Sequence, residues 1–398
     1  MRPGNNKKDD NQCKSVKSAV KSLIFKDLFV STFSTVSLSY ASVLPKSQPE
    51  NATRPNQVLL SESKHVIFES CSRYSILDMD SSKLIIFLLA SRPKFLVASA
   101  APVLVGSALG YEANHVASAT VATSTSFNLH LFILAILSIM ALHSGANLAN
   151  DYFDHISGND WLNKNPTPFS GGSRFIQKGI LPPKAILLTS LTCLATGSAI
   201  GVIILLLTKS VFILIIGIIG LLGGFFYTAP PIKLGYRCIG ELVIGFLFGL
   251  LPVFGSYYLH TSTIDAIPFL PACIVSILIF LVILVNEFPD VFADAAVNKR
   301  TIVVRFSVPA SVWIYRTALI ASFAVAAVML TFHTMFFAGL FYLFTSPIAI
   351  IAIKVANKDD LAKPGQYRAS RITVLLHTLG SLALAGGFLV SALTSTPT

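Results

Sequence analysis

The sequence predicts an all-α integral membrane protein with nine transmembrane helices, and three observations lead to that prediction. The 398 residues are 53% hydrophobic and only 12% charged, whereas soluble domains carry roughly 25% charged residues. From residue 82 onward, apolar stretches close to the length of a membrane-spanning helix follow one another along the chain. Basic residues are concentrated in alternate loops between these stretches, as the positive-inside rule requires of a multi-pass protein.

The chain changes character near residue 80. Residues 1–80 are polar, rich in Ser and Lys, and lack a long apolar run, so we expect a disordered N-terminal extension in front of a transmembrane domain at 81–398. Within the extension, Ser15–Phe29 has enough amphipathic character to lie on a membrane surface instead. A transit peptide is the third interpretation, against which Asp9 and Asp10 argue.

Each of the nine apolar segments approaches the ~20 residues that a helix needs to cross a bilayer. In order, they cover residues 94–111, 127–148, 185–207, 210–228, 241–259, 266–286, 309–332, 335–353 and 372–393. The fourth is only just long enough. A very short loop separates it from the third, so these two are expected to form a helical hairpin. All nine are expected to be unbroken helices.

The loops predict the orientation of the spans. The loops after even-numbered segments hold Lys164, Arg174, Lys178, Lys233, Arg237, Lys299, Arg300, Arg305, Lys354, Lys358, Lys363, Arg368 and Arg371. The loops after odd-numbered segments hold only Lys209 as a basic residue. The basic side should be cytoplasmic, which places the N-terminus inside and the C-terminus outside.

Net charge and cysteine spacing argue against nucleic-acid binding, a disulfide framework and a zinc site. A formal charge of +11 would suggest nucleic-acid binding in a soluble protein, but here the anchoring of loops at the membrane explains it, so we expect a lipid bilayer and no nucleic acid as partner. The five cysteines are scattered and form no CxxC pair, which disfavours a disulfide framework and a zinc site.

Two of the predicted cytoplasmic helix ends carry Asn and Asp at helical spacing. After the second segment these residues are Asn147, Asn150, Asp151 and Asp154. After the sixth segment they are Asn286, Asp290 and Asp294. Steps of three and four residues place side chains on one helix face, and carboxylates this close repel one another unless a cation lies among them. The two clusters therefore predict a site where Mg²⁺ is shared with the oxygens of a diphosphate.

Basic residues in the same loops are candidates to neutralise that diphosphate. Arg174 follows the first cluster, and Lys299 and Arg300 follow the second. Lys233 lies in the loop between the fourth and fifth segments. Arg174, Lys299 and Arg300, like Lys178, are each explained equally well as a positive-inside anchor.

Four passages together resemble the UbiA superfamily of membrane prenyltransferases, and most closely its MenA branch, which prenylates 1,4-dihydroxy-2-naphthoate. The passages are Ser91–Gly110, Asn150-x-x-x-Asp154-x-x-x-Gly158, Tyr227–Leu242, and Asn286-x-x-x-Asp290-x-x-x-Asp294 followed by Lys299-Arg300-Thr301. They extend over about residues 85–395, and the paired acidic motifs are the specific part of the likeness.

The resemblance implies nine helices around a central cavity with a cytoplasmic cap. It implies that Asn150, Asp154, Asp290 and Asp294 bind the metal. It makes Asp154, Asp290 and Asp160 the catalytic acids, with Asp160 replacing a further Asp that hydroxybenzoate-type members carry where this chain has Gly158. Together with the charge pattern, it implies that the diphosphate is bound by Asn147, Asp151, Lys233, Asn286, Lys299, Arg300 and Arg174.

The expected function is therefore Mg²⁺-dependent transfer of a polyprenyl group from polyprenyl diphosphate to an aromatic acceptor, by a multi-pass enzyme of the cell membrane whose active site faces the cytoplasm. The resemblance favours 1,4-dihydroxy-2-naphthoate. Related enzymes using 4-hydroxybenzoate, haem, a chlorophyllide or a glycerol phosphate lipid are the first alternative. An ion-coupled transporter is disfavoured because its acids would lie near the bilayer midplane, often on broken helices. A scaffold with vestigial acids is the third alternative.

Overall fold

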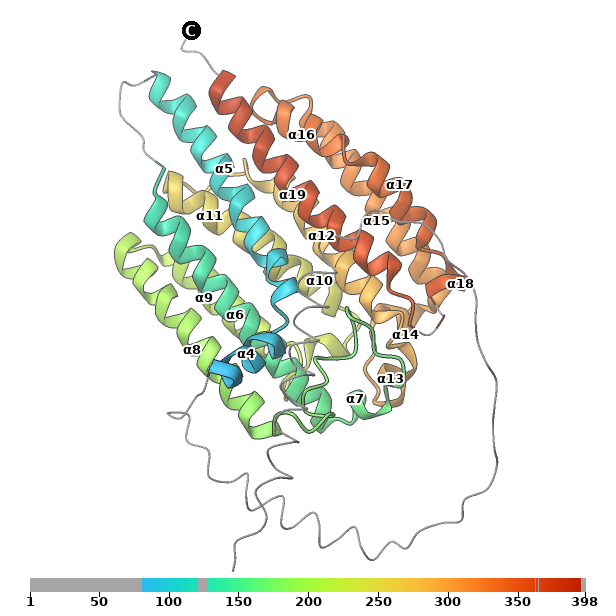
Figure 1. The fold of residues 1–398 in the computed structure, drawn as a ribbon. Helices are drawn as coiled ribbons and strands as arrows, with labels where there is room; N and C mark the ends of the chain where they lie inside the picture. The colour runs from blue at the N-terminus through green and yellow to red at the C-terminus, as the bar shows by residue number, and fades with distance from the viewer. Residues whose placement is uncertain (1–80, 121–126, 362, 364, 395–398) are drawn as a thin grey trace, which may run out of the picture. The chain divides into compact units, whose positions relative to one another are not determined.

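The computed structural model describes residues 81–120, 127–361, 363 and 365–394. The predicted extension at 1–80 lies outside the described residues. In the described part, all regular secondary structure is helical, apart from one isolated bridge between Arg237 and Arg300 (Figure 1).

All nine predicted segments are helical. They correspond to α5 (Val97–Thr120), α6 (Leu129–Ile156), α8 (Pro183–Thr208), α9 (Val211–Phe225), α10 (Gly240–Gly245) continued through a π-helical turn (Phe246–Leu250) into α11 (Leu251–Thr261), α12 (Phe269–Glu287), α15 (Val308–Met329), α16 (Phe336–Leu343) with α17 (Ser346–Val355), and α19 (Arg368–Thr394). The short helices are α4 (Ser81–Ala90), α7 (Asn159–Leu162), α13 (Val291–Ala296), α14 (Ile302–Phe306) and α18 (Lys358–Leu361).

The all-helical membrane class is confirmed, and the count of nine spans is not. Within the described ranges, seven helices are long and apolar enough to cross a membrane, and α16 with α17 would make an eighth span. The remaining segment, α9, has only 15 residues. The chain is thus a multi-pass membrane protein with seven or eight spans of full length and one shorter apolar helix.

The expectation of unbroken spans is wrong at 335–353. There α16 and α17 meet at a bend of 48°. Pro347 stands in the first turn of α17 and has no N–H to offer the preceding turn, so the helix restarts at this point. A milder irregularity precedes Pro252, where the fifth span passes through its π-helical turn.

Helix α12 forms the centre of the hydrophobic core. It packs against α10, α15 and α19, and its side chains Leu278, Leu281 and Leu284 are fully buried. Helix α5 packs against both α11 and α19 (Figure 1). Its approach to α11 depends on small residues: a Cβ at Gly110 would lie 2.9 Å from Cβ of His260.

Large apolar side chains remain exposed on the outer helices α8 and α9. Leu206, Leu207 and Val211 are examples at the connection between them. Such exposure suits a surface that is covered by lipid. At the other end of the bundle, α6 leads into α7, α12 leads into α13, and α7 packs against α13 (Figure 1). The two acidic motifs are therefore brought to one place.

Candidate active site

The first acidic motif lies on the last turns of α6. Because α6 continues to Ile156, Asn150 and Asp154 are one helical turn apart, and Nδ2 of Asn150 donates to Oδ2 of Asp154 at 3.0 Å. The other carboxylate oxygen of Asp154 accepts from the Tyr236 hydroxyl at 3.3 Å. Asp154 is buried, so its charge requires nearby compensation.

The spacing of the second motif predicted that it lies on one continuous helix, and this prediction is wrong. Helix α12 ends at Glu287, Asp290 is the N-cap of α13, and Asp294 lies in the first turn of α13. Pro289 accounts for the interruption, because proline removes a backbone donor and clashes with the turn before it. Both aspartates and Asn286 nevertheless line the same cavity.

Lys299 joins the two motifs. Its Nζ lies 3.3 Å from Oδ2 of Asp154 and 3.4 Å from Oδ1 of Asp294. Burial alone would lower the pKa of the Lys299 ammonium, but Asp154 and Asp294 outweigh it and hold that pKa well above its ordinary value. One carboxylate from each motif thus contacts the same ammonium group, and these two carboxylates favour its charged form.

The loop after α6 supplies further contacts between the motifs. Asn159 donates to Asp294 at 2.7 Å, and Asn163 donates to Asp290 at 2.6 Å. The backbone N–H of Gly171 donates to the other oxygen of Asp290 at 3.0 Å. Asn159 and Asn163 were not predicted from the sequence. The only signal for them was their position as amides directly after the first motif.

Asp160 lies behind these residues, at the start of α7. Burial, followed by repulsion from Asp154 and Asp151, raises the pKa of its carboxyl group to about 7. Gln177 donates to its Oδ2 at 3.0 Å. Gly172 passes so close that a Cβ there would lie 2.9 Å from this oxygen, and its φ of 77° also favours glycine.

The polar groups surround a cavity of about 170 Å³. Of the predicted site residues, those that line it are Asn147, Asn150, Asp154, Asp160, Asn286, Asp290, Asp294 and Lys299. Arg92, Asn159, Asn163 and Glu287 line it as well and were missed. Arg92 stands in the Ser91-Arg-Pro passage at the start of the first span, which was noted only for its family likeness.

The other four predicted site residues do not line this cavity, as far as the described residues show. They are Asp151, Arg174, Lys233 and Arg300. Asp151 accepts from the Arg92 side chain and from the backbone N–H of Ser173. Arg174 donates to the carbonyl oxygens of Asp160 and Asn163. Lys233 and Arg300 line a separate hollow nearby. Contact of these four residues with a diphosphate stays a prediction.

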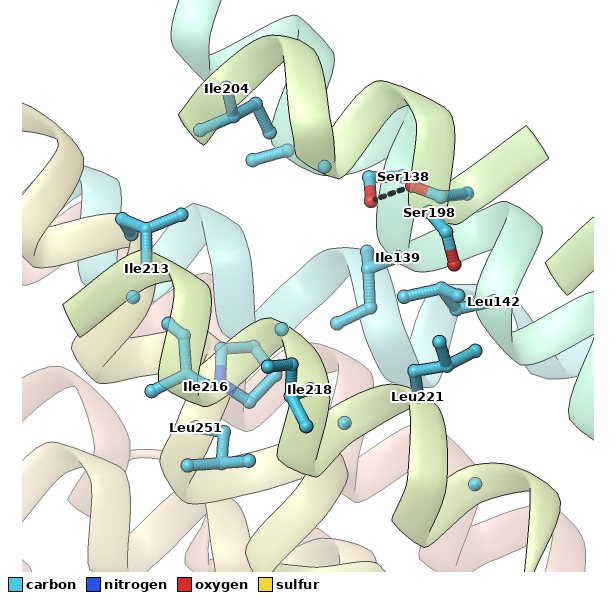
Figure 2. Close-up of a pocket in the computed structure, with 18 of the residues that line it drawn as sticks. Ser138, Ile139, Leu142, Ser198, Ile204, Ile213, Ile216, Ile218, Leu221 and Leu251 are labelled. Carbon is cyan, nitrogen blue, oxygen red and sulfur yellow. Dashed lines mark hydrogen bonds between the residues drawn. The ribbon is translucent and has the colours of Figure 1, made fainter. Parts of the chain in front are cut away.

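An apolar chamber of about 320 Å³ adjoins the polar cavity, since Ala146, Gly224 and Phe248 line both. Its walls come mostly from α6, α8, α9 and α11, with contributions from α5 and the π-helical turn before α11. Figure 2 shows Ile139 and Leu142 of α6 facing Leu221 of α9 across the chamber. Volumes of this order are typical of ligand pockets in proteins. A molecule with a polar head and a long apolar tail would match the two compartments.

The donors at the polar end suit a hard cation. Burial, together with repulsion from Asp294, raises the pKa of Asp290 to about 6, and Oδ1 of Asn286 is buried without a hydrogen-bond partner among the described residues. Over the same residues, no three His, Cys, Asp or Glu side chains form a ready-made metal cage. Mg²⁺ commonly takes one or two carboxylates and completes its shell with water and substrate phosphate. The donors therefore fit a metal that binds together with a phosphorylated ligand.

Comparison with known proteins gives a consistent picture. The model of the UbiA prenyltransferase family matches residues 114–373. The chain is 29% identical over 319 residues to the 1,4-dihydroxy-2-naphthoate octaprenyltransferase of Haemophilus influenzae, covering 78% of this chain and 98% of that protein. It is 27% identical over 305 residues to the enzyme of the same name in Bacillus subtilis, covering 76% and 91%. It is 23% identical over 314 residues to the 2-carboxy-1,4-naphthoquinone phytyltransferase of Synechocystis, covering 76% and 92%.

Solved structures agree at the level of the fold. A UbiA homologue from Aeropyrum pernix K1 superposes with a TM-score of 0.53 at 14% identity, covering 74% of this chain and 97% of that one. A UbiA homologue from Archaeoglobus fulgidus bound to DMAPP and Mg²⁺ gives a TM-score of 0.50 at 13% identity, covering 77% and 99%. With the family model matching more than half of its residues, the chain belongs to the UbiA prenyltransferase family.

Proposed function

We propose that this protein transfers a polyprenyl group from polyprenyl diphosphate to 1,4-dihydroxy-2-naphthoate in menaquinone biosynthesis. The observation that carries the proposal is the convergence of Asp154 and Asp294 on Lys299, in a polar cavity that shares lining residues with an apolar chamber. The relatives named as naphthoate prenyltransferases align with most of this chain and support that choice of acceptor.

The metal in this proposal is Mg²⁺. Asn150, Asp154, Asp290 and Asp294 would hold it, because they present oxygen donors from both motifs around one cavity. When bound, Mg²⁺ neutralises diphosphate oxygens and makes the diphosphate a better leaving group. The A. fulgidus homologue bound to DMAPP and Mg²⁺ supports the same pairing of metal and prenyl diphosphate here.

The basic side chains of the cavity act on the leaving group. The bond between the allylic carbon and the diphosphate oxygen breaks, and both electrons stay with the diphosphate. Lys299 and Arg92, which line the cavity, are placed to stabilise that growing negative charge. The carboxylates beside them keep both groups charged, since Lys299 pairs with Asp154 and Arg92 pairs with Asp151.

The apolar chamber acts on the other half of the donor. It takes the isoprenoid tail among aliphatic side chains and excludes water from the allylic cation. Phe248, at the junction of the two compartments, is placed to stabilise the cation with its ring face. A ring carbon of the naphthoate then forms the new C–C bond and loses its proton. The carboxyl group leaves as CO₂, and a proton takes its place on the ring.

The acceptor is tested with purified protein, Mg²⁺ and radiolabelled geranylgeranyl diphosphate, offered in parallel reactions with 1,4-dihydroxy-2-naphthoate, 4-hydroxybenzoate and a glycerol phosphate lipid. We expect a labelled prenyl naphthoquinol, which air oxidises to the naphthoquinone during extraction, as the main product. Label transferred only to another acceptor would overturn the choice of naphthoate and leave the prenyltransferase activity standing.

The acidic end of the bundle is proposed to face the cytoplasm of a cell membrane. The asymmetry of Lys and Arg between the two sets of loops supports this orientation. It would give the active site direct access to a diphosphate and an acceptor made in the cytoplasm.

A further inference from the structure

A second hollow, of about 630 Å³, lies beside the active-site cavity. It is formed by the loop before α10, the loop between α13 and α14, and Arg305 of α14. Four of its lining residues are basic, namely Lys233, Arg237, Arg300 and Arg305, and none of its lining residues is acidic. The hollow therefore concentrates positive charge at one point of the acidic end of the bundle.

None of these four residues forms an ion pair within the described part of the chain, and Arg237, Arg300 and Arg305 are exposed. Lys299, only one residue before Arg300, is by contrast shared by two carboxylates. Cations gathered without counter-charge repel one another, and an arriving anion relieves that repulsion. Anchoring of a loop at the membrane surface needs only single basic residues, so it does not explain why four of them line one hollow.

Two of the guanidinium groups are held in place by their own loops. Nε of Arg237 donates to the carbonyl of Ile232 at 2.6 Å, and Nε of Arg300 donates to Oδ1 of Asn298 at 3.0 Å. The two loops are tied together by the backbone bridge between Arg237 and Arg300. Lys233 and Asn298 have φ values of 48° and 57°, and left-handed conformations of this kind persist where the surroundings enforce them. Among the described residues, the terminal guanidinium nitrogens of Arg237 and Arg300 form no hydrogen bond, so they are available to a ligand.

Tyr236 connects the hollow to the active site. It lines the hollow, and its hydroxyl lies 3.3 Å from Oδ1 of Asp154. Nζ of Lys233 in the hollow lies 5.0 Å from the centre of the Tyr236 ring, and Nζ of Lys299 in the active site lies 5.8 Å from it. One aromatic side chain thus adjoins both compartments.

We propose that this basic hollow is a second phosphate-binding site, which receives inorganic diphosphate after it has left the active-site cavity. The inference rests on the proposed function, which makes diphosphate a product. Guanidinium groups bind phosphate oxygens in a bidentate manner and do so more strongly when both partners are charged. An anionic lipid headgroup offers the same chemistry, so the test separates the two sources.

The first arm measures binding of radiolabelled inorganic diphosphate to the full-length protein in neutral detergent with EDTA, which suppresses metal-dependent binding at the acidic motifs. We expect wild-type protein to bind, and the double variant Arg237→Gln/Arg300→Gln to bind about tenfold more weakly or worse. Arg371→Gln, which removes an exposed arginine outside the hollow, should bind like wild type. No binding by wild type, or equal binding by the double variant, would overturn the site.

The second arm repeats the measurement in nanodiscs of neutral lipid and in nanodiscs containing phosphatidylglycerol, at equal ionic strength. Retained binding in both supports a site for diphosphate. Loss of binding in the anionic nanodiscs identifies a lipid-headgroup site and overturns the product assignment. Prenyl transfer is assayed on the same wild-type preparation. Transfer without diphosphate binding would overturn this inference alone, whereas binding without transfer would overturn the proposed function.

Discussion

Lys299 shows at the scale of one residue how the site is assembled. It contacts Asp154 at the end of α6 and Asp294 in α13, side chains that are 140 positions apart in the sequence. It is 12% exposed at its side chain, so solvent screens these contacts little. Its three N–H donors also allow it to reach a diphosphate while it keeps both carboxylates in place.

Replacing Lys299 by Met should therefore lower prenyl transfer at least about 100-fold, the order of loss seen when one charge-stabilising donor is removed. The rate with saturating donor and acceptor is the measurement. Lys178→Met is the matched control, because Lys178 is exposed and lies outside the cavity lining. A Lys299→Met rate within a few-fold of the control would show that this ammonium does not act on the leaving group.

Gly172 permits a second test at the same scale. Gly172→Ala and Gly179→Ala both place a methyl group on a residue with positive φ, and both should destabilise the fold by roughly 1–2 kcal/mol. Only at Gly172 does the added Cβ meet Asp160; at Gly179 nothing lies within 4 Å. We expect kcat/KM for the prenyl diphosphate to fall in Gly172→Ala alone. Equal kcat/KM values in the two variants would mean that the position of Asp160 is irrelevant to turnover.

At the scale of elements, the sequence predicted much of the fold. Every predicted segment is helical, because a run of apolar residues near bilayer length has few other stable structures. The breaks were missed. The bend between α16 and α17 and the interruption after Glu287 both occur at prolines, and a proline inside an apolar run can either be tolerated or end the helix, depending on tertiary packing.

The helical face of the first acidic motif was predictable for the same reason, since helical spacing is a local property, whereas the second motif is divided between α12 and α13. The contacts between motifs were not predictable. Asn159 reaches Asp294 and Asn163 reaches Asp290 across more than 120 positions of sequence, and one sequence carries no record of such pairs. Lys233 and Arg300 are the opposite case, because they were predicted as site residues but lie outside the lining of the active-site cavity. Charge type suggested that they meet the active-site diphosphate, whereas the path of their loops places them in the neighbouring hollow.

Helix α9 carries the prediction that belongs to this scale. A leucine at Gly220 would project into the apolar chamber, where a Cβ has nothing within 4 Å. We expect Gly220→Leu to lower kcat/KM about tenfold for an octaprenyl donor, by overfilling the space of the tail, and to leave a geranyl donor nearly unaffected. Ile219→Phe adds bulk to the same helix outside the chamber lining and is the control. Equal losses with both donors would place the tail elsewhere.

At the scale of the whole molecule, the uneven distribution of Lys and Arg predicts orientation. A cysteine introduced at Lys178, in the loop after α7, should escape a membrane-impermeant maleimide in intact cells. A cysteine at Thr263, in the loop after α11, should react. Both positions are exposed, and wild-type protein gives the background from native cysteines. The reverse pattern of labelling would place the acidic end of the bundle outside.

The central claim is that both acidic motifs serve one metal-dependent prenyl transfer. The most direct measurement is formation of prenylated naphthoquinol from geranylgeranyl diphosphate and 1,4-dihydroxy-2-naphthoate by wild-type, Asp154→Asn and Asp290→Asn proteins, each with Mg²⁺ and with EDTA. We expect product from wild type with Mg²⁺ only, and a loss of at least about 100-fold in either variant, because each carboxylate holds charge that the other motif cannot replace. Undiminished, EDTA-resistant product formation by either variant would contradict the claim.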